Sequence, residues 1–177
     1  MMKWVLIGVS GVAIAVLASL WGIYASPVFV AINYSTSLSE RLFVWHKSVP
    51  KLLNRDDFVF IAYRTFPGSL YFNTGERLIK KVAGLPGDTV EFSAKSHKVC
   101  YRLTGADRIC QEFPREILDR KNKILPIPFQ NQGNESGSFV IPTGQLYVYG
   151  TNPRSYDSRY FGLIFHDQLV GKLNPIF

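Results

Sequence analysis

Apolar residues form one long run near the N-terminus and many short runs after it. The long run extends over 21 apolar or small residues, from Trp4 to Tyr24, without a charge or a proline. A helix of about 20 such residues crosses the hydrocarbon core of a bilayer. We therefore interpret residues 1–25 as a membrane anchor and residues 26–177 as a domain outside the membrane.

The residues flanking this run indicate how it is oriented in the membrane and whether it is retained or cleaved. Lys3 and the terminal amine precede it, so the positive-inside rule directs the N-terminus to the cytoplasm. The alternative is a cleaved signal peptide ending at Ile23-Tyr24-Ala25, a poor cleavage site. Signal peptides have apolar cores of about 7–15 residues, which are shorter than this run. The pattern favours a retained anchor.

The short runs after the anchor have the β-branched and aromatic composition of strands, and they lie between turn residues. Many short strands at close spacing are typical of an all-β domain, usually a partly closed barrel or a sandwich. The sequence thus predicts a mainly β outer domain with strands at Val28–Asn33, Arg41–Trp45, Phe58–Arg64, Asp88–Ser93, Lys98–Arg102, Gln145–Tyr149 and Leu169–Leu173.

One stretch, from Gly105 to Gly137, does not follow this strand pattern. It is charged from Arg115 to Arg120 and then rich in proline, asparagine and glutamine. We interpret residues 105–137 as an inserted cap with one short helix, and substrate selection is a hypothesis for the part between Cys110 and Gly137.

The formal net charge of +7 belongs mainly to the outer domain, because Lys3 is only one of twenty basic residues. Such a charge suits an anionic membrane surface. Nucleic-acid binding would need a basic stripe with interleaved aromatic residues, whereas these charges are scattered. We predict a solvated basic surface and no nucleic-acid partner.

The two cysteines, Cys100 and Cys110, are close enough in sequence to form a disulfide in an oxidising compartment. The alternative is a pair of buried, free thiols. A zinc site is disfavoured, because His97 lies near Cys100 but no fourth ligand has the spacing of a zinc finger. We predict a disulfide, no metal and no cofactor.

Lys80 is the residue whose surroundings indicate chemistry. It follows Leu78 and Ile79 on a predicted β-segment and precedes an apolar run that ends in a Leu-Pro-Gly-Asp turn. Burial disfavours the charged form of a lysine, and a neutral lysine amine is a general base. A pKa near 7–8 would cost the fold roughly 3–4 kcal/mol near pH 7. Taken alone, the residue is better explained as a surface lysine.

A general base needs a nucleophile, and the segment from Asn33 to Ser37 offers serine hydroxyls just beyond the anchor. Serine is a weak nucleophile near neutral pH and needs a base. The histidines His46, His97 and His166 are candidates for a Ser-His-Asp triad, but none sits in a motif such as Gly-x-Ser-x-Gly. Lysine as the base explains more of the sequence.

Two long segments resemble those of one enzyme family. Lys80 to Asp88 (KKVAGLPGD) closely resembles the lysine box of the type I signal peptidases, serine–lysine membrane proteases that remove leader peptides. Pro142 to Asn152, followed by Ser155 to Gly162 (SYDSRYFG), resembles the family's last box. The resemblance runs from about Ser35 to Lys172, with Cys110 to Ser136 unmatched. It implies a signal-peptidase-like fold.

The resemblance assigns four catalytic roles. Ser37 matches the nucleophile and Lys80 the general base. Ser35 matches a hydroxyl that assists the Ser37 backbone N–H in the oxyanion hole, where each donor typically contributes a factor of about 10²–10³. Ser155 matches the serine that orients the lysine amine. Lys81 is the rival for the lysine role, but strand alternation directs it to the opposite face.

The same alignment gives four further residues a supporting role. Asp157 and Arg159 match an ion pair that supports the site structurally. Leu38 and Ile79 match residues that line a pocket for a small residue before the cut bond.

The serine box departs from that of the leader peptidases, which have Ser-Met-x-Pro. Here the residues LSERLF follow Ser37. The frame Asn33-x-Ser35-x-Ser37 with Leu42-Phe43 is more similar to the TraF-type peptidases of plasmid conjugation systems, which mature pilin subunits. Those commonly have proline at the position of Ser39 and glycine at that of Arg41, and both are absent here.

The resemblance therefore implies a single-pass protein of the inner membrane with a Ser/Lys endopeptidase domain in the periplasm. Its partners would be the lipid bilayer and a pilin precursor, matured by hydrolysis or by cyclisation, because the same acyl-enzyme serves both. Two alternatives stay open. One is a general or specialised leader peptidase for secreted proteins, and the other is a non-catalytic, membrane-anchored component of a conjugation apparatus.

Overall fold

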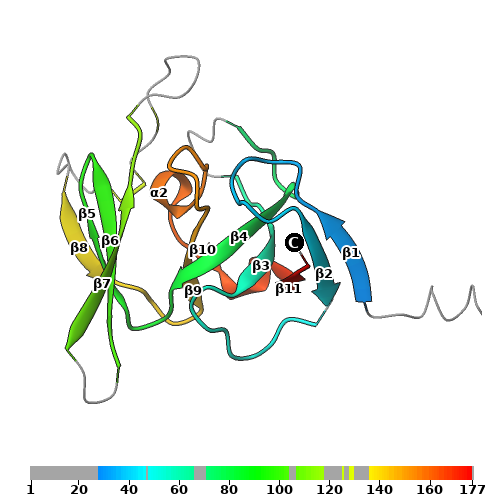
Figure 1. Ribbon diagram of the computed structural model, residues 1–177. Coiled ribbons are helices and arrows are strands. Elements are labelled where there is room, and N and C mark those ends of the chain that lie inside the picture. Colours follow the sequence, from blue (N-terminus) through cyan, green and yellow to red (C-terminus); the bar gives the residue numbers. More distant parts are fainter. Residues whose placement is uncertain are drawn as a thin grey trace, which may run out of the picture.

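The chain forms a mainly β structure in this computed structural model, as the sequence predicts (Figure 1). The structure describes residues 28–46, 48–65, 71–103, 107–117, 125, 128–129 and 136–176. The predicted membrane anchor, residues 1–25, lies outside the described residues. Within them, no helix has the length and apolar character that crossing a membrane requires.

The larger of two sheets has seven strands and carries the residues predicted for catalysis or their loops. Every neighbouring pair in it is antiparallel. Its strands are, in spatial order, β1 (Val28–Ile32), β2 (Leu42–His46), β11 (Leu169–Pro175), β3 (Phe58–Ala62), β4 (Arg77–Gly84), β9 (Gln145–Tyr149) and β10 (Ile164–Phe165).

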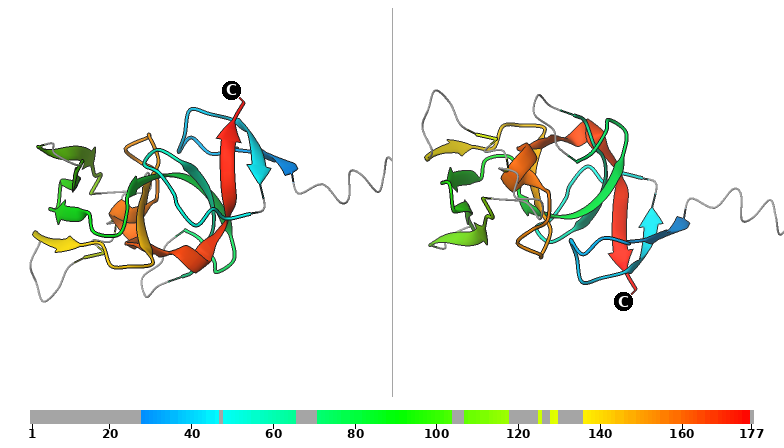
Figure 2. Two further views of the ribbon diagram at one scale, coloured as in Figure 1. Left: turned by 90° about the horizontal axis from the view of Figure 1, so that it is seen from below. Right: turned by 90° about the horizontal axis from the view of Figure 1, so that it is seen from above.

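The smaller sheet has four antiparallel strands and lies beside the larger one (Figures 1 and 2). Two short helical elements, α2 (Ser158–Phe161) and the 3₁₀ turn η1 (His166–Gln168), follow β9. The strands of the smaller sheet are, in spatial order, β7 (Arg108–Pro114), β6 (Ser96–Arg102), β5 (Thr89–Phe92) and β8 (Gly137–Val140).

The large sheet curves round on itself but does not close (Figure 2). Its outermost strands, β1 and β10, have no pairing with each other in the described part of the chain. The prediction of a mainly β domain is therefore confirmed. Of the expected partly closed barrel or sandwich, the structure shows a curved sheet that does not close, with a second sheet beside it.

Strand β3 shows why the large sheet is buried on both faces. Its residues alternate between two apolar clusters, as the two-residue period of a strand requires. Val59 and Ile61 pack in one cluster with Val82, while Phe58 packs in the other with Phe43. A third cluster joins the large sheet to the small one, with members from both. Lys80 lies on the same face of β4 as Val82, and therefore faces the first cluster.

The predicted insertion at residues 105–137 contributes β7 to the small sheet. The described residues of this stretch, 107–117, 125, 128–129 and 136–137, contain no helix, and the short helix expected there stays a prediction for the rest of the stretch. The sequence does not predict β7, because only Phe113 of its seven residues is buried and the strand therefore lacks an alternating apolar pattern. Pairing with β6, rather than an apolar face, defines this strand.

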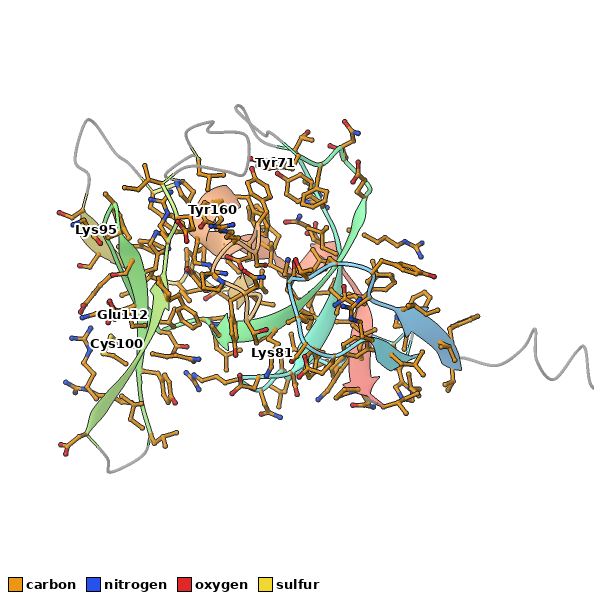
Figure 3. The ribbon with its side chains drawn as sticks, turned by 45° about the horizontal axis from the view of Figure 1, so that its top comes forward. Tyr71, Lys81, Lys95, Cys100, Glu112 and Tyr160 are labelled. Carbon is orange, nitrogen blue, oxygen red and sulfur yellow. A yellow bond between two sulfur atoms is a disulfide. The ribbon has the colours of Figure 1, made fainter. Side chains whose placement is uncertain are left out.

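A disulfide joins Cys100 on β6 to Cys110 on β7, as predicted. The two residues are direct partners in the strand register. Figure 3 shows Cys100 and Glu112 together on this sheet. The bond thus links a buried strand to an exposed one, since Cys100 is buried and Cys110 is exposed.

Replacing both cysteines by serine is expected to destabilise the fold. The cysteines are 10 residues apart, and closing a loop of that length stabilises by about 2–3 kcal/mol on the chain-entropy model. Denaturant unfolding of the wild type and of the Cys100→Ser/Cys110→Ser variant measures the difference, and a reducing agent should lower the wild type to the level of the variant. Equal stability of all three samples would contradict the expectation.

Candidate active site

Three segments that are distant in sequence meet at the amine of Lys80. Lys80 lies in β4, Ser37 lies in the loop between β1 and β2, and Ser155 lies in the loop between β9 and α2. The Lys80 Nζ is 3.1 Å from the Ser37 Oγ and 2.9 Å from the Ser155 Oγ. The amine is therefore within hydrogen-bond distance of both hydroxyls at once.

The surroundings of Lys80 lower its affinity for a proton. Its side chain is only 3% exposed. Burial lowers the pKa of the amine from 10.5 to about 8, with Asp157 opposing this shift and Arg159 adding to it. An amine with this pKa is partly neutral near pH 8, and a neutral amine beside a hydroxyl can accept its proton.

Lys81, the rival for this role, lies on the opposite face of β4. Its Nζ is 3.8 Å from the Asp56 Oδ1 and 4.9 Å from the centroid of the Phe58 ring. The side chain is labelled in Figure 3. Strand alternation therefore separates the two neighbouring lysines as the sequence predicts.

The loop that carries Ser37 is held against the loop that carries Ser155. The backbone N–H of Asn152 donates to the Ser37 carbonyl at 3.2 Å. Gly150 lies between the two serines, and a Cβ at this position would collide with the Ser155 side chain and with the Ser37 carbonyl oxygen. Only glycine allows this approach without a shift of the backbone.

Ser35 is positioned by Asn33, a buried residue at the end of β1. The Ser35 hydroxyl donates to the Asn33 Oδ1 at 2.7 Å, and the Ser35 backbone N–H donates to the same oxygen at 3.1 Å. The Asn33 Nδ2 in turn donates to the Glu40 carbonyl at 3.1 Å. The Ser37 backbone N–H points to the Ser35 Oγ over 3.4 Å, a long contact that a better acceptor can replace.

Asp157 and Arg159 form a buried ion pair behind the Ser155 loop. The Arg159 guanidinium donates to both Asp157 carboxylate oxygens, at 2.8 and 2.6 Å. Asp157 also accepts from the Gly150 N–H at 2.7 Å and caps the N-terminus of α2. Arg159 donates to the carbonyls of Gly150 and Asn152 as well. The pair thereby holds the turn between β9 and Ser155.

None of the three histidines lines the cavity that contains Ser37 and Lys80. His97 is fully buried beside Tyr147, with its Nδ1 2.8 Å from the Tyr147 hydroxyl oxygen. Burial lowers the pKa of His97 to about 3, so it stays neutral. The geometry therefore gives no support to a Ser-His-Asp triad.

The cavity has a volume of about 450 Å³ and contains Ser35 as well as Ser37 and Lys80 in its lining. Ile79 lies in its wall, where the resemblance places a pocket residue. Leu38 is placed differently, because its side chain points inward and packs against Phe43 and Phe58. Leu38 also borders a second, more open hollow, which lies between the segment after Ser37 and the loop after β9.

Comparison with known proteins identifies the family. The model of the family described as "Signal peptidase, peptidase S26" matches residues 1–177. The chain belongs to this signal peptidase family. It is 31% identical over 103 residues to Signal peptidase IB of Staphylococcus aureus, covering 58% of this chain and 53% of that protein. It is 29% identical over 112 residues to Signal peptidase I of Bacillus caldolyticus, covering 58% and 54%.

These matches span about half the length of the curated relatives of this signal peptidase family member. A crystal structure of a signal peptidase I from Enterococcus faecalis is also similar, with 22% sequence identity and a TM-score of 0.40. That match covers 72% of this chain and 100% of the other.

Sequence reasoning on this signal peptidase family member missed two residues of the site. In the sequence Asn33 is notable only as part of the serine frame, although a polar residue at the end of an apolar strand indicates a buried side chain with hydrogen bonds. Gly150 lay within the last box, but nothing in that motif indicates that two loops press against its Cα. A close approach of two distant loops is visible only in the folded chain.

The lowered pKa of Lys80 is expected to make stability depend on pH. Between pH 8 and pH 10.5 the unfolded chain keeps the Lys80 proton while the folded chain has lost it, so stability rises with pH across this window. Below about pH 8 both states hold the proton, and the folded state bears the full penalty of about 3 kcal/mol.

A Lys80→Met variant isolates this effect, because it has no proton to lose at this site. The wild type should gain about 3 kcal/mol on the variant between pH 8 and pH 10.5. Denaturant unfolding of both proteins at several pH values measures this, and parallel curves would show that the amine is solvated.

Removing the Asn33 side chain is expected to lower the free energy of unfolding by about 1–3 kcal/mol, because the Glu40 carbonyl and the Ser35 N–H lose their partner. Thr36→Ala, at an exposed position of the same loop, is the matched control. Thermal unfolding of Asn33→Ala and Thr36→Ala compares the two. Equal losses would mean that the Asn33 hydrogen bonds contribute nothing particular.

Proposed function

We propose that this protein is a membrane-anchored serine endopeptidase that removes leader peptides with a Ser37/Lys80 dyad. The observation that carries the proposal is the Lys80 amine, buried with a lowered pKa and within hydrogen-bond distance of Ser37 and Ser155. Membership of the signal peptidase family supports the reaction class. The wall of the adjoining cavity supports a peptide substrate, because it is mostly apolar.

In the first step, neutral Lys80 takes the proton of the Ser37 hydroxyl while the Ser37 Oγ attacks the carbonyl carbon of a peptide bond. The negative charge that develops on the carbonyl oxygen is held by the Ser37 N–H and the Ser35 hydroxyl. The Ser35 hydroxyl turns away from Asn33 to donate this bond. Lys80 then protonates the leaving amine as the C–N bond breaks, which leaves an acyl group on Ser37.

In the second step, neutral Lys80 takes a proton from the nucleophile as it attacks the ester carbonyl carbon, and Lys80 then gives this proton to the Ser37 Oγ as the ester bond breaks. With water as the nucleophile the product is a free carboxylate. With the N-terminal amine of the same substrate as the nucleophile, the product is a cyclic peptide. Ser155 keeps the amine directed at Ser37 in both steps, because its hydroxyl is 2.9 Å from the Lys80 Nζ.

An extended peptide is the substrate conformation that the strand register favours. Among the described residues, 77–80 of β4 pair with β3 on one side only, since β9 joins β4 from Lys81 onward. In the described part of the chain, β1 pairs with β2 alone. Both free edges border the cavity. A peptide strand placed there could form main-chain hydrogen bonds, a common mode of peptide recognition.

We place this domain on the outer face of the inner membrane, in the periplasm, with residues 1–25 as the anchor. Exposed apolar side chains on β1 support this, because the strand follows the apolar N-terminal run directly. Val28, Phe29, Val30 and Ile32 are the exposed residues of this strand. Such a strip suits contact with lipid beside the substrate cleft. The disulfide also suits an oxidising compartment.

For the substrate, we propose a pilin precursor of a conjugation system. The support is the serine box, whose frame Asn33-x-Ser35-x-Ser37 followed by Leu42-Phe43 is similar to the TraF-type peptidases. A leader peptide on secreted proteins in general is the second candidate. The printed names of the relatives, Signal peptidase IB and Signal peptidase I, favour that alternative. A non-catalytic role has less support, because a fold without chemistry gains nothing from burying Lys80.

Substitution of either dyad residue is expected to abolish processing. Ser37→Ala removes the nucleophile and Lys80→Ala the base, so each should lower the rate of cleavage by at least about 10³-fold. Lys81→Ala, at the neighbouring position on the other face of β4, should cleave normally and serves as the control. Gel electrophoresis of a co-expressed precursor follows the reaction.

Normal maturation by Ser37→Ala or Lys80→Ala would overturn the enzyme proposal. Mass spectrometry of the mature product separates the two outcomes of the second step, since cyclisation leaves the product one water lighter than the trimmed linear chain. Co-expression with several secretory precursors tests the substrate proposal, because processing of many leaders would favour a general leader peptidase.

A further inference from the structure

The cavity beside the serine contains one cation that the reaction does not use. Arg77, at the start of β4, lines the same cavity as Ser37 and Lys80. It precedes Lys80 by three residues, which corresponds to about 10 Å along a strand. By alternation Arg77 and Ile79 lie on one face of β4 and Lys80 on the other, and all three line the cavity.

The exposed Arg77 guanidinium lies near two aromatic rings and not beside a carboxylate. Its central carbon is 5.8 Å from the Trp45 ring centroid and 5.6 Å from that of Phe60, and both rings line the cavity. In the described part of the chain, Arg77 has no acidic partner. Five other arginines do have one, and these pairs are Arg55 with Asp88, Arg64 with Asp167, Arg108 with Glu91, Arg154 with Glu116 and Arg159 with Asp157.

A cation in this setting favours an anionic ligand. The neighbouring wall of the cavity is apolar, with Val30, Ile32, Phe60 and Ile79. The two rings favour a cation at this place through cation–π attraction, and a guanidinium matches the two oxygens of a carboxylate. A lysine or arginine of a substrate at the same place would meet a like charge, which is unfavourable.

The cavity suits the part of the substrate that stays bound to Ser37. Two hollows adjoin the serine loop, the cavity with Arg77 and the more open one beside Leu38. After the first step the acyl segment remains attached to the enzyme, while the leaving segment has to diffuse away. The more enclosed cavity therefore accommodates the acyl segment, which contains the residues before the cut bond.

We infer that Arg77 is a specificity-determining residue that selects substrates with an acidic residue two or three positions before the cut bond. This inference rests on the proposed peptidase function and specifies the substrate class of that same site.

The test uses the full-length protein in detergent and a set of peptides that differ at one position before the cut bond. Glu, Gln or Lys is placed at the second, third or sixth residue before the bond. The wild type should cleave the Glu peptide with a kcat/KM about two- to fivefold higher than the Gln peptide at the second or third residue. The sixth residue lies about 20 Å from the cut bond along an extended chain, beyond the position of Arg77, and should show no preference.

Charge reversal gives the sharper result. Arg77→Glu should prefer the Lys peptide over the Glu peptide, and Arg77→Gln should lose the preference between Glu and Gln. Arg102→Glu is the matched control, because Arg102 is an exposed arginine at the end of β6, away from the cavity. It changes the net charge equally and should keep the wild-type preference. High salt should reduce the preference of the wild type.

The two proposals fail in different ways. If Arg77→Glu keeps the wild-type ratio of Glu to Gln cleavage while the Gln peptide is still cut, the inference about Arg77 is wrong and the peptidase function stands. If no peptide is cut, the peptidase function fails. Binding of the same peptides to the Ser37→Ala variant then still tests Arg77, since the Glu peptide should bind with a lower Kd than the Gln peptide.

A lipid role for Arg77 is an outcome of the same set of variants. If Arg77→Glu weakens binding to vesicles with anionic lipid more than Arg102→Glu does, and leaves the peptide ratios unchanged, the guanidinium serves the membrane surface and the inference is overturned.

Discussion

The buried ion pair between Asp157 and Arg159 connects the parts of this structure that the site requires. Arg159 donates to carbonyls of the turn after β9 and to the Pro114 carbonyl at the end of β7, so it joins the two sheets. Asp157 receives the Gly150 N–H and caps the helix that follows. A pair of this kind is costly to bury and strongly destabilising to break, because each charge would be left without its partner. It therefore fixes the Ser155 loop more rigidly than neutral contacts would.

The same burial that orders this region lowers the pKa of Lys80. In the proposed function this amine acts as a base, which requires an apolar environment, and the first apolar cluster of the large sheet supplies that environment. Stability and chemistry are therefore in opposition at one residue. The hydroxyls of Ser37 and Ser155 reduce the conflict, because they give the amine hydrogen bonds without giving it a counter-charge.

The sequence alone was enough to propose the Ser37/Lys80 dyad, because the motif that suggests it is local and long. The motif from Lys80 to Asp88 contains the strand, the turn and the proposed base in one segment. The strands with apolar faces can be predicted from their composition. The remaining features depend on contacts between distant segments. Strand β7 has almost no apolar face, and its existence follows from its pairing with β6. Leu38 turns into the core because Phe43 and Phe58 leave a place for it there. In the sequence Arg77 has the pattern of an ordinary surface arginine, and only the fold places it near the rings of Trp45 on β2 and Phe60 on β3.

Gly150 gives this arrangement a simple diagnostic in sequence terms. Its backbone is pressed between Ser155 and the Ser37 carbonyl, so any side chain there separates the two serine loops. A related chain could keep both serines and the lysine and still be unable to bring them together if it has lost this glycine. Among homologues of uncertain activity, the residue at this position therefore distinguishes chains that can bring the proposed dyad together from chains that have the serines and the lysine but cannot do so.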